Sequence, residues 1–579
     1  MNVREGIRVT AGVIARRVKR LLIKAGVGEV LRVMADPRTT WLYARDYWST
    51  RRQYGALLSS WKAPADPLGR ALIVGIHGFV PSAKEEGMYG MALGMRGYLP
   101  VCLVHRSSRV IKHYRLFGIK DFEFFEEYLA RVDRGPLEQE AAVALAGTPT
   151  YTDLIDYEYR GVHVGRHVLS TIARRLHKGT LQLDEPVVQA MLRELMPEAM
   201  RAVLAAEALF DAIRPSVVLF NERGYTPFGE LFDVALSRKL NTIQWVASHR
   251  DDARIYKRYT AETHNVHPHS LADNAWEALK SLPWTDGHRE ALFRELYSQY
   301  ASGGWFNFQR LQHNKQIKSR TEVQRQLGLD PAKKTAIVFS HVLWDATFFY
   351  GESLFEDYEK WLVATVRAAC RNPIVNWIVK LHPVNVWRLE ADGYHAELTE
   401  QVVLREQVGP LPSHVKLLMP DTDINTFSLF DVADYCVTVR GTIGIEISAY
   451  GVPVLVAGTG RYSGRGFTID ASSQEEYLEN LARIQDFPRP SREETELARR
   501  HAYALFNLRP LLLRSFEIVH SRGRNVFHSL DGQLVVRAKS LADLAAASDL
   551  SRFAEWAVQS ADPDLMLPWP AKAKGHSSW

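Results

Sequence analysis

Short apolar runs alternate with amphipathic stretches from residue 71 onward. Apolar runs of strand length occur in the first half at 71–76, 99–104, 217–220 and 242–246. Stretches with helical periodicity separate them at about 84–95, 119–131, 189–213 and 227–239. This alternation is typical of parallel sheets covered by helices, and it predicts an α/β fold.

The same alternation begins again in the second half. The expected strands are 335–340, 376–381, 415–418, 435–439 and 453–457, and the expected helices are 355–371, 424–431, 442–450 and 474–486. A polar stretch at 270–333, ending in Asp330-Pro331, is typical of a domain junction, and the chain becomes helical again at 493–504 and 542–558.

We therefore predict two facing doubly wound Rossmann-like domains with helical extensions at both ends. The predicted parts are a basic amphipathic helical segment (1–70), a first Rossmann-like domain (71–333), a second one (334–487) and a helical extension (488–579). Ligands of such sheets bind beyond the carboxyl ends of the strands. We expect the chemistry to lie in the loops that follow strands.

Composition narrows the function classes. The chain has 579 residues, 46% of them hydrophobic, and a formal net charge of +6. Residues 1–34 hold eight basic and two acidic residues, so the whole net charge lies there and the rest is balanced. Binding to nucleic acid needs a basic surface on the folded body, so no nucleic-acid partner is expected.

Three scattered cysteines and the absence of long apolar runs predict the compartment. Cys102, Cys370 and Cys436 lie far apart in apolar surroundings, which favours neither disulfides nor a cysteine zinc site. No run reaches the 18 apolar residues of a spanning helix. We expect a cytoplasmic protein.

Residues 1–34 have the pattern of an amphipathic basic helix. Val3, Ile7, Ile14 and Leu21 share one face, with Arg and Lys on the others. Such a helix can lie on an anionic membrane, which would make the protein peripheral on the inner face of the cytoplasmic membrane. The alternative is a helix that packs on the protein's own core with a solvated basic face.

A possible phosphate site follows the expected strand at 435–439. There Arg440-Gly441-Thr442 begins a helix whose free N–H groups and dipole suit a phosphate or diphosphate. Thr442 can cap the helix or donate to that phosphate, and Glu446, one turn on, can accept hydrogen bonds from ribose hydroxyls. The alternative is an ordinary capped helix with a surface glutamate.

Lys380-Leu381-His382-Pro383 ends another expected strand of the second domain. Pro383 fixes the loop, His382 can bond a phosphate or a base, and Lys380 can add positive charge. His-Pro alone is a weak signal, since His267-Pro268 also occurs in this chain.

Two carboxylates are rival general bases. Asp345 follows the first strand of the second domain, and Glu222 follows the strand at 217–220. Either can take a proton from an acceptor hydroxyl, and either can be a turn or helix cap. No phosphate-binding loop with a Gly-x4-Gly-Lys pattern and no zinc spacing is present, so no metal and no cofactor is expected.

Several of these motifs together resemble the capsule polysaccharide biosynthesis family of bacterial sugar transferases. They are Lys380–Pro383, Gly441–Glu446, Tyr450–Val454 and Tyr462–Thr468, and the resemblance covers about 335–485. It implies a two-domain transferase fold of the GT-B kind, with acceptors on the first domain and a nucleotide-sugar on the second. It also implies that His382, Pro383, Gly441 and Thr442 hold the donor, with CMP-linked keto-sugars as donors of the best understood members. Arg440 before the Gly-Thr pair departs from the usual small residue and can change the pose of the donor.

The resemblance leaves three function classes. The first is a metal-independent glycosyltransferase that extends a surface polysaccharide or a lipid-linked glycan. The second is a nucleotide-sugar 2-epimerase on the same scaffold, which needs no acceptor. The third is a non-catalytic polysaccharide-binding or assembly protein. The first is preferred because donor-type residues and candidate bases both follow strands of the predicted cleft.

Overall fold

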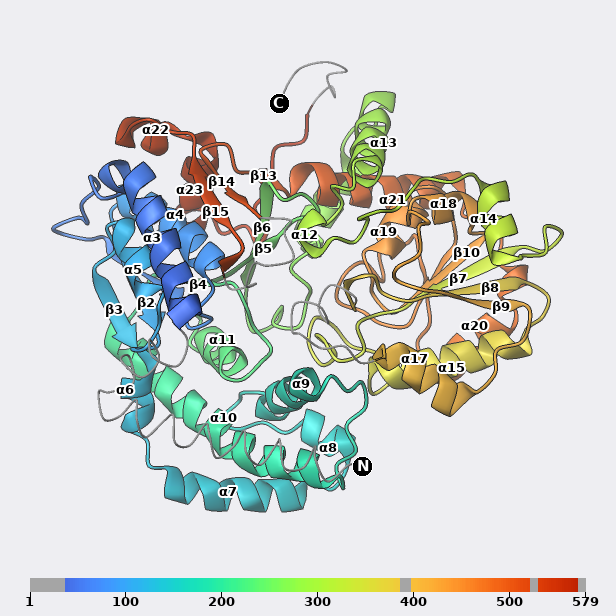
Figure 1. The fold of residues 1–579 in the computed structure, drawn as a ribbon, viewed down its shortest axis with the longest axis horizontal. Helices are drawn as coiled ribbons and strands as arrows, with labels where there is room; N and C mark the ends of the chain where they lie inside the picture. The colour runs from blue at the N-terminus through green and yellow to red at the C-terminus, as the bar shows by residue number, and fades with distance from the viewer. Residues whose placement is uncertain (1–36, 386–396, 521–529, 571–579) are drawn as a thin grey trace. The chain divides into compact units, whose positions relative to one another are not determined.

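The computed structural model describes residues 37–385, 397–520 and 530–570. The chain divides into two compact units (Figure 1). Unit 1 comprises Met1–Glu127 and Arg514–Ala554, and unit 2 comprises Tyr128–Leu513 and Glu555–Trp579. The amphipathic helix predicted for residues 1–34 lies outside the described residues.

Unit 1 contains three parallel strands with helices between them. Its elements are α3 (Pro37–Leu58), β1 (Gly69–Val74), α4 (Val80–Met95), β2 (Tyr98–Val104), α5 (Ile111–Leu116), β3 (Asp121–Phe124), the hairpin strands β14 (Phe516–Val519) and β15 (Gln533–Val536), and α22 (Leu541–Ala546). β2 pairs in parallel with both β1 and β3. The parallel α/β alternation predicted for this region is confirmed.

The helix predicted over 119–131 is wrong in its first half. Residues Asp121–Phe124 form β3, and only Phe125–Ala130 form a helix, α6. The sequence Asp-Phe-Glu-Phe alternates polar and aromatic residues with period two, which suits a strand. Pairing with β2, which sets Phe122 beside Cys102 and Phe124 beside Val104, supplies the tertiary context that local helix propensity does not contain.

The first part of unit 2 combines a group of helices with four strands. Its elements are α7 (Arg134–Gly147), α8 (Tyr151–Ile155), α9 (Val164–Leu176), α10 (Pro186–Ile213), β4 (Val217–Phe220), α11 (Phe228–Ser237), β5 (Thr242–Ala247) and β6 (Ala253–Tyr259). β4 and β5 are parallel, whereas β6 runs antiparallel to β5 and pairs with the short strand β13 (Leu511–Leu512).

The second sheet of unit 2 has six parallel strands. Its strands are β7 (Thr335–Phe339), β8 (Asn376–Lys380), β9 (Val415–Leu418), β10 (Tyr435–Thr438), β11 (Val454–Val456) and β12 (Ile469–Asp470), in the spatial order β12-β11-β10-β7-β8-β9. The chain builds outward from β7 on one side and from β10 on the other. The order therefore reverses between β7 and β10, which is the position where doubly wound sheets bind ligands.

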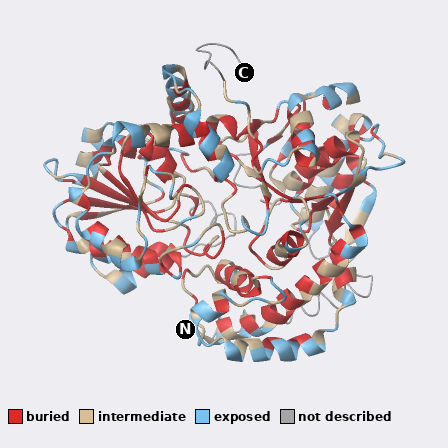
Figure 2. Cartoon of the chain, turned by 180° about the vertical axis from the view of Figure 1, so that it is seen from behind, coloured by how far each residue is buried: buried red, intermediate tan, exposed pale blue. Residues whose placement is uncertain are grey.

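Helices cover both faces of this sheet. They are α15 (Tyr358–Arg371), α17 (Thr399–Val403), α18 (Ser428–Val432), α19 (Ile443–Ser448), α20 (Gln474–Ala482) and α21 (Arg492–Tyr503). Alternate residues of each strand serve the two faces: Ile337 and Phe339 join the core under α18, α19 and α21, while Ala336 and Val338 join the core under α15 and α20. The central strands β7, β8, β10 and β11 are buried, and the helices expose their outer sides (Figure 2).

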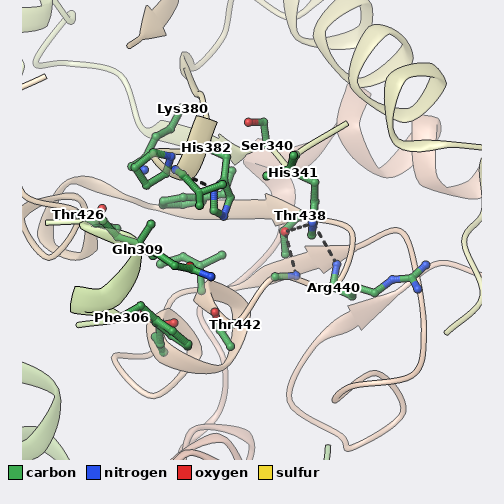
Figure 3. A pocket seen from close by; sticks show the side chains of 18 of the residues that line it. Phe306, Gln309, Ser340, His341, Lys380, His382, Thr426, Thr438, Arg440 and Thr442 are labelled. Carbon is green, nitrogen blue, oxygen red and sulfur yellow. Dashed lines mark hydrogen bonds between the residues drawn. The ribbon is translucent and has the colours of Figure 1, made fainter. Parts of the chain in front are cut away.

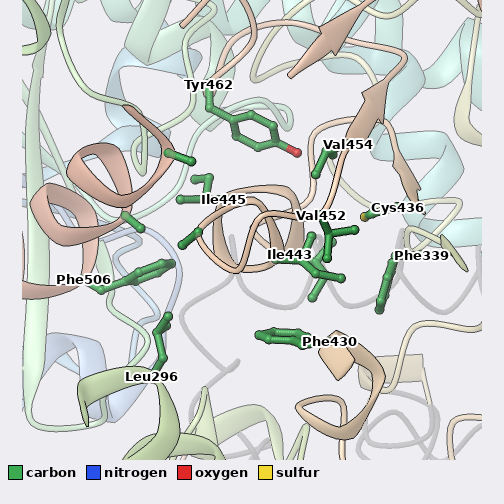
Figure 4. Close-up of a cluster of buried hydrophobic side chains, with 14 of the residues drawn as sticks. Leu296, Phe339, Phe430, Cys436, Ile443, Ile445, Val452, Val454, Tyr462 and Phe506 are labelled. Carbon is green, nitrogen blue, oxygen red and sulfur yellow. The ribbon is translucent and has the colours of Figure 1, made fainter. Parts of the chain in front are cut away.

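α19 lies inside one of these cores. Figure 4 shows Ile443 and Ile445 of α19 surrounded by Phe339, Phe430 and Val454, all of which are buried. The position of α19 is therefore set by apolar packing on several sides.

The polar stretch 270–333 also joins this core. It forms α12 (Asp273–Ser281), α13 (Asp286–Ala301) and α14 (Arg320–Leu327), whose inward residues include Trp276, Leu296 and Val323. The predicted carboxyl-terminal helices appear as α21, α22 and α23 (Ser548–Gln559), and the strands β13–β15 in that region were not predicted. None of the helices in the described part of the chain combines the length and apolar character needed to cross a bilayer.

Candidate functional site

A cavity of about 320 Å³ opens at the carboxyl ends of β7, β8 and β10, within unit 2. Its walls come from the loops after these strands, from α19 and from residues 267–269 and 300–312. It lies at the reversal of strand order and is large enough for a nucleotide-sized ligand. The sequence-predicted residues that line it are Asp345, Lys380, His382, Pro383, Arg440, Gly441, Thr442 and Glu446; Glu222 is absent from its lining.

Close packing explains the glycines after β10. Gly441 donates its N–H to Thr438 Oγ1 at 3.3 Å, and a Cβ on Gly441 would come within 3.0 Å of that oxygen. A Cβ on Gly444 would come within 2.0 Å of the Tyr462 hydroxyl, which itself donates to the Gly441 carbonyl at 2.9 Å. Gly441 has no positive φ, so close contact with Thr438, and not a left-handed backbone, disfavours a side chain there.

The start of α19 offers fewer free N–H groups than expected. Gly444 N–H donates to the Gly441 carbonyl at 3.0 Å, and Ile445 N–H donates to the Thr442 carbonyl at 2.9 Å. Within the described chain, only the N–H groups of Thr442 and Ile443 lack a partner there. Thr442 makes no side-chain cap, because its hydroxyl bonds Glu446 instead.

Glu446 lies in the cavity wall and is held from two sides. It is 1% exposed, and its carboxyl group accepts hydrogen bonds from the Tyr300 and Thr442 hydroxyls. Burial raises the pKa of Glu446 to about 7, although both hydrogen bonds and the charges of Arg461 and Lys380 act to lower it. At neutral pH this side chain is therefore a mixture of carboxylate and neutral acid.

Lys380 and His382 come from the end of β8 and the loop after it. Lys380 is buried beside the Phe339 ring, and no hydrogen bond joins its Nζ to another described residue. Burial lowers the pKa of Lys380 to about 7; Lys315 adds to this effect and Glu446 opposes it. His382 Nδ1 accepts the Val384 N–H at 3.3 Å, which fixes the ring next to Pro383.

The Arg440 side chain binds a neighbouring loop of the protein. Its guanidinium donates to the Gly351 carbonyl at 2.8 Å and to Ser353 Oγ at 2.6 Å. Figure 3 shows this side chain leading away from Thr442 and the other labelled cavity residues. Arg440 thus anchors the loop at 351–353, and its N–H is the part nearest the other cavity groups.

His341 is a neutral hydrogen-bond donor in the cavity. Burial, together with the charges of His382, Arg440 and Arg461, lowers the pKa of His341 well below its usual value. Its Nε2 faces the Thr438 hydroxyl at 3.3 Å and the Arg440 N–H at 3.5 Å (Figure 3). Because Thr438 already accepts from Gly441, its own hydrogen can go to Nε2, which leaves the ring proton on Nδ1.

Both candidate bases, Asp345 and Glu222, lie close to the Arg174 guanidinium. Arg174 Nη1 lies 3.5 Å from Glu222 Oε2 and 4.0 Å from Asp345 Oδ1. The Tyr225 hydroxyl donates a hydrogen bond to Asp345 Oδ1 at 2.5 Å. Burial opposes the charge of Arg174, yet Asp345, Tyr225 and Glu222 together raise its pKa. The loop that carries Asp345 contains two non-glycine residues with positive φ, Ala346 at 55° and Tyr350 at 77°, a strain that is common at functional sites.

Arg461 and two histidines were missed by the sequence analysis. Arg461 lines the cavity after β11, and its guanidinium contacts His267 Nε2, while its buried Nε has no hydrogen-bond partner within residues 37–385, 397–520 and 530–570. Burial lowers the pKa of Arg461 to about 10, so it stays charged at neutral pH. Burial and Arg461 lower the pKa of His267 well below its usual value and that of His269 to about 3, so both rings are neutral. No ion pair joins Arg461 to a carboxylate in the described part of the chain.

These groups give the cavity a chemical character. Arg461 and the partly charged Lys380 supply positive charge, and neither forms an ion pair with a carboxylate in the described part of the chain. Three neutral histidines, His267, His269 and His341, line the space beside them. Trp305 and Phe306 add aromatic surface. The combination suits a ligand with phosphate groups and a flat ring. Among the described residues, no three His, Cys, Asp or Glu side chains are grouped as metal ligands.

Comparisons with known proteins give structural similarities only. No protein-family model and no curated protein matches the chain. Among solved structures it is similar to the Thermosulfurimonas dismutans KpsC, beta Kdo 2,4 transferase, with 15% identity and a TM-score of 0.30 over 51% of this chain and 81% of that chain. It is also similar to the UDP-GlcNAc 2-epimerase from Neisseria meningitidis bound to UDP-GlcNAc, with 11% identity and a TM-score of 0.26 over 76% of this chain and 97% of that chain.

A third similar structure is the spinosyn rhamnosyltransferase SpnG complexed with spinosyn aglycone, with 12% identity and a TM-score of 0.25 over 75% of this chain and 95% of that chain. Two glycosyltransferases and an epimerase are thus among the proteins to which this chain is similar, and its own sheets, with the strand pairings described above, define its fold.

Proposed function

We propose that this chain is a glycosyltransferase that binds a nucleotide-sugar donor in the cavity of its six-stranded sheet. One observation carries the proposal: the cavity lies at the reversal of strand order and contains the buried cation Arg461 beside Lys380, which is partly charged at neutral pH. Neither forms an ion pair with a carboxylate of the described residues. Burying unpaired cations is costly unless an anionic ligand compensates them.

The donor's phosphates fit the side of the cavity formed by Arg461, Lys380 and His382. A guanidinium and an amine are the side chains that bind phosphate oxygens best, and His382 adds a ring nitrogen. In Figure 3, Phe306 and Gln309 lie across the cavity from Lys380 and His382. They offer an aromatic face and an amide to the base of the nucleotide.

Asp345 is the proposed general base. The acceptor hydroxyl would give its proton to the Asp345 carboxylate while its oxygen attacks the anomeric carbon of the donor sugar. The bond from that carbon to the nucleotide then breaks, and the nucleotide leaves with the electron pair. The guanidinium of Arg174 lies 4.0 Å from the Asp345 carboxyl group, and the Tyr225 hydroxyl donates a hydrogen bond that orients it. Glu222 also forms an ion pair with Arg174 but does not line the cavity. We therefore propose that Glu222 helps to position Arg174 and does not act as the base.

The finer assignment follows the sequence resemblance. We propose a CMP-linked keto-sugar as donor and a surface polysaccharide or lipid-linked glycan as acceptor, at the inner face of the cytoplasmic membrane. The resemblance motifs Lys380–Pro383 and Gly441–Glu446 support this, because both contribute to one cavity.

A donor panel tests the proposal. The protein is incubated with CMP-, UDP-, GDP- and dTDP-linked sugars, with and without glycan acceptors, and nucleotides and sugars are separated chromatographically. Release of free nucleotide that depends on the acceptor supports a transferase. Conversion of the donor without an acceptor would identify an epimerase instead. Lack of both binding and turnover for every donor would refute the proposal.

A further inference from the structure

Helix α3 of unit 1 exposes two tryptophans on one face. Trp41 and Trp48 are each 58% exposed. At 3.6 residues per turn, Trp41, Arg45, Trp48 and Arg52 fall within an arc of about 60°. Thr50, which is buried, lies on the opposite side of the helix. The tryptophans therefore belong to the outward face of α3.

The inward face of α3 is anchored by its only acidic residue. Asp46 accepts a hydrogen bond from Lys84 Nζ at 2.7 Å and bonds His113 Nε2 at 2.9 Å. Burial opposes ionisation, but these two partners lower the pKa of Asp46 below its usual value. The negative charge of α3 is thus neutralised inside unit 1 and does not reach the outward face.

The outward face carries unopposed positive charge. Arg38, Arg45, Arg51 and Arg52 are exposed, and none forms an ion pair with a carboxylate of the described residues. Arg45 stacks over Trp41 with 4.8 Å to the ring centroid, and Arg51 stacks over Trp48 at 5.1 Å. Exposed tryptophan rings are thus combined with guanidinium groups that cover them.

The neighbouring helix α5 extends this basic surface. His113 of α5 contacts Tyr47 of α3 edge to face at 5.9 Å, which places the two helices side by side. Lys112 and Arg115 of α5 are exposed, and Arg109 stacks on Tyr43 of α3. We call Trp41, Trp48, Arg38, Arg45, Arg51 and Arg52 the α3 face.

We propose that the α3 face docks on the surface of an anionic lipid bilayer. Tryptophan rings favour the boundary between headgroups and acyl chains, because the ring is apolar and its N–H remains wet. Arginine can extend to lipid phosphates while its methylene stem covers apolar surface. A face with two exposed tryptophans, four arginines and no acid is complementary to such a surface in both polarity and charge.

This inference is independent of the proposed function and of residues 1–34. The sequence indicates a membrane-binding helix at residues 1–34, which lie outside the described residues, whereas α3 is a described helix on which Trp41 and Trp48 are exposed. A membrane site on α3 would hold even if the cavity of unit 2 bound a different ligand.

Vesicle flotation of the full-length protein tests the inference. The vesicles contain phosphatidylcholine with or without phosphatidylglycerol. The double variant Trp41→Ser/Trp48→Ser and the double variant Arg45→Gln/Arg52→Gln are each expected to lower binding to the anionic vesicles by about tenfold or more. The arginine variant should also flatten the dependence on salt. The variant Arg294→Gln/Tyr297→Ser removes an exposed arginine and an exposed aromatic residue from α13, and it should bind like the wild type.

Two further comparisons make the result decisive. Circular dichroism and thermal unfolding must show that the α3 variants are folded. The substitutions Arg16→Gln, Arg17→Gln and Arg20→Gln reduce the charge of the amino-terminal segment, and Trp41→Ser/Trp48→Ser should still lower binding in that background. Folded α3 variants that bind anionic vesicles like the wild type would overturn the proposal. So would a chain that binds no vesicles but forms a dimer lost on substituting the tryptophans, or one that binds only soluble polyanions.

Discussion

At the scale of single residues, Arg461 has the largest expected effect on ligand binding. It is a buried cation in the cavity wall, and its Nε has no hydrogen-bond partner among the described residues, while its guanidinium contacts the neutral ring of His267. A hydrogen bond between a guanidinium and a phosphate contributes about 1.5–3 kcal/mol. Arg461→Met should therefore weaken nucleotide binding by roughly tenfold to a hundredfold in titration calorimetry.

The control for this variant is Arg371→Met, an exposed arginine at the end of α15. It should leave the nucleotide Kd unchanged. Equal affinities of the Arg461 variant and the wild type would show that the phosphates do not lie beside Arg461.

The pKa of Lys380 predicts how the affinity for a nucleotide-sugar depends on pH. Its pKa of about 7 in the free protein means that it is mostly charged at pH 6 and mostly neutral at pH 8.5, and an anionic ligand favours the charged form. Affinity for a nucleotide-sugar should therefore fall as pH rises above 7, by at most about tenfold per pH unit for this one group. A nucleotide-sugar is the right probe because its phosphodiester groups do not titrate in this range.

The variant Lys380→Met should bind more weakly and show a smaller slope. The remaining slope would belong to Glu446, whose pKa is also about 7 and whose carboxylate repels an anion at higher pH. Identical pH profiles for Lys380→Met and the wild type would assign the titration to other groups.

At the scale of elements, the packing of α19 against Tyr462 is the most constrained feature near the cavity. A Cβ on Gly444 would lie 2.0 Å from the Tyr462 hydroxyl oxygen, well inside contact distance. Overpacking of this kind costs about 1–3 kcal/mol, so Gly444→Ala should lower the Tm and weaken nucleotide binding. Tyr462 would have to move, and its hydrogen bond to the Gly441 carbonyl would weaken.

Gly135→Ala is the matched control for this variant. Gly135 also lies in a helix, α7, and the nearest heavy atom to its added Cβ is 3.7 Å away. Alanine there should be neutral or stabilising by at most about 1 kcal/mol. If Gly444→Ala unfolded at the same temperature as Gly135→Ala, the packing of α19 would be looser than described.

The elements near the site were largely predictable from the sequence. The second-domain strands are continuous apolar runs flanked by turn residues, and β7, β8 and β10 begin and end within a residue or two of the predicted bounds. β3 and β6 were not predicted, because an isolated alternating stretch or an antiparallel return strand depends on its partner for stability.

Only the site residues at or just after a single predicted strand could be identified from the sequence. Lys380 ends the recognisable strand β8 and His382 follows it, while Gly441 follows β10 and Glu446 lies in the helix after it. Tyr300 enters the same cavity from the polar stretch at 270–333, where no local pattern marks it as a cavity residue. His267 lies just before that stretch, and its His-Pro pair, the same pattern as His382-Pro383, is a signal that could have found it. Arg461 adjoins the Tyr462–Thr468 motif, which is the one signal that could have found it. The engagement of Arg440 by Gly351 and Ser353 is a tertiary contact that the sequence does not indicate.

At the scale of the whole molecule, the carboxyl-terminal residue Asp564 holds groups that contact the cavity loop at 267–270. Asp564 is buried between Lys257, at 2.8 Å, and Arg509, at 3.0 Å, and it accepts the Ala272 N–H at 2.7 Å. Arg509 also donates to the carbonyls of Ser270 and Pro268, which flank the cavity residue His269. All of these residues belong to unit 2.

Removing the Asp564 charge should therefore affect both stability and binding. Asp564→Asn would leave two buried cations without a counter-charge, and breaking a buried ion pair costs about 3–5 kcal/mol. We expect a clearly lower Tm and, at temperatures where the variant is folded, a weaker nucleotide Kd because the loop at 267–270 is less firmly held. Asp562→Asn changes an exposed neighbour and should alter neither value. A lower Tm with an unchanged Kd would show that the segment stabilises the fold without positioning the cavity.

The place where a nucleotide binds decides whether the cavity of the six-stranded sheet is the donor site. A crystal structure of the protein with the nucleotide of its preferred donor should show the phosphates within hydrogen-bond distance of Arg461 and Lys380, and the base toward Phe306 and Gln309. A nucleotide bound anywhere else, or an empty cavity at saturating nucleotide, would rule out this cavity as the donor site.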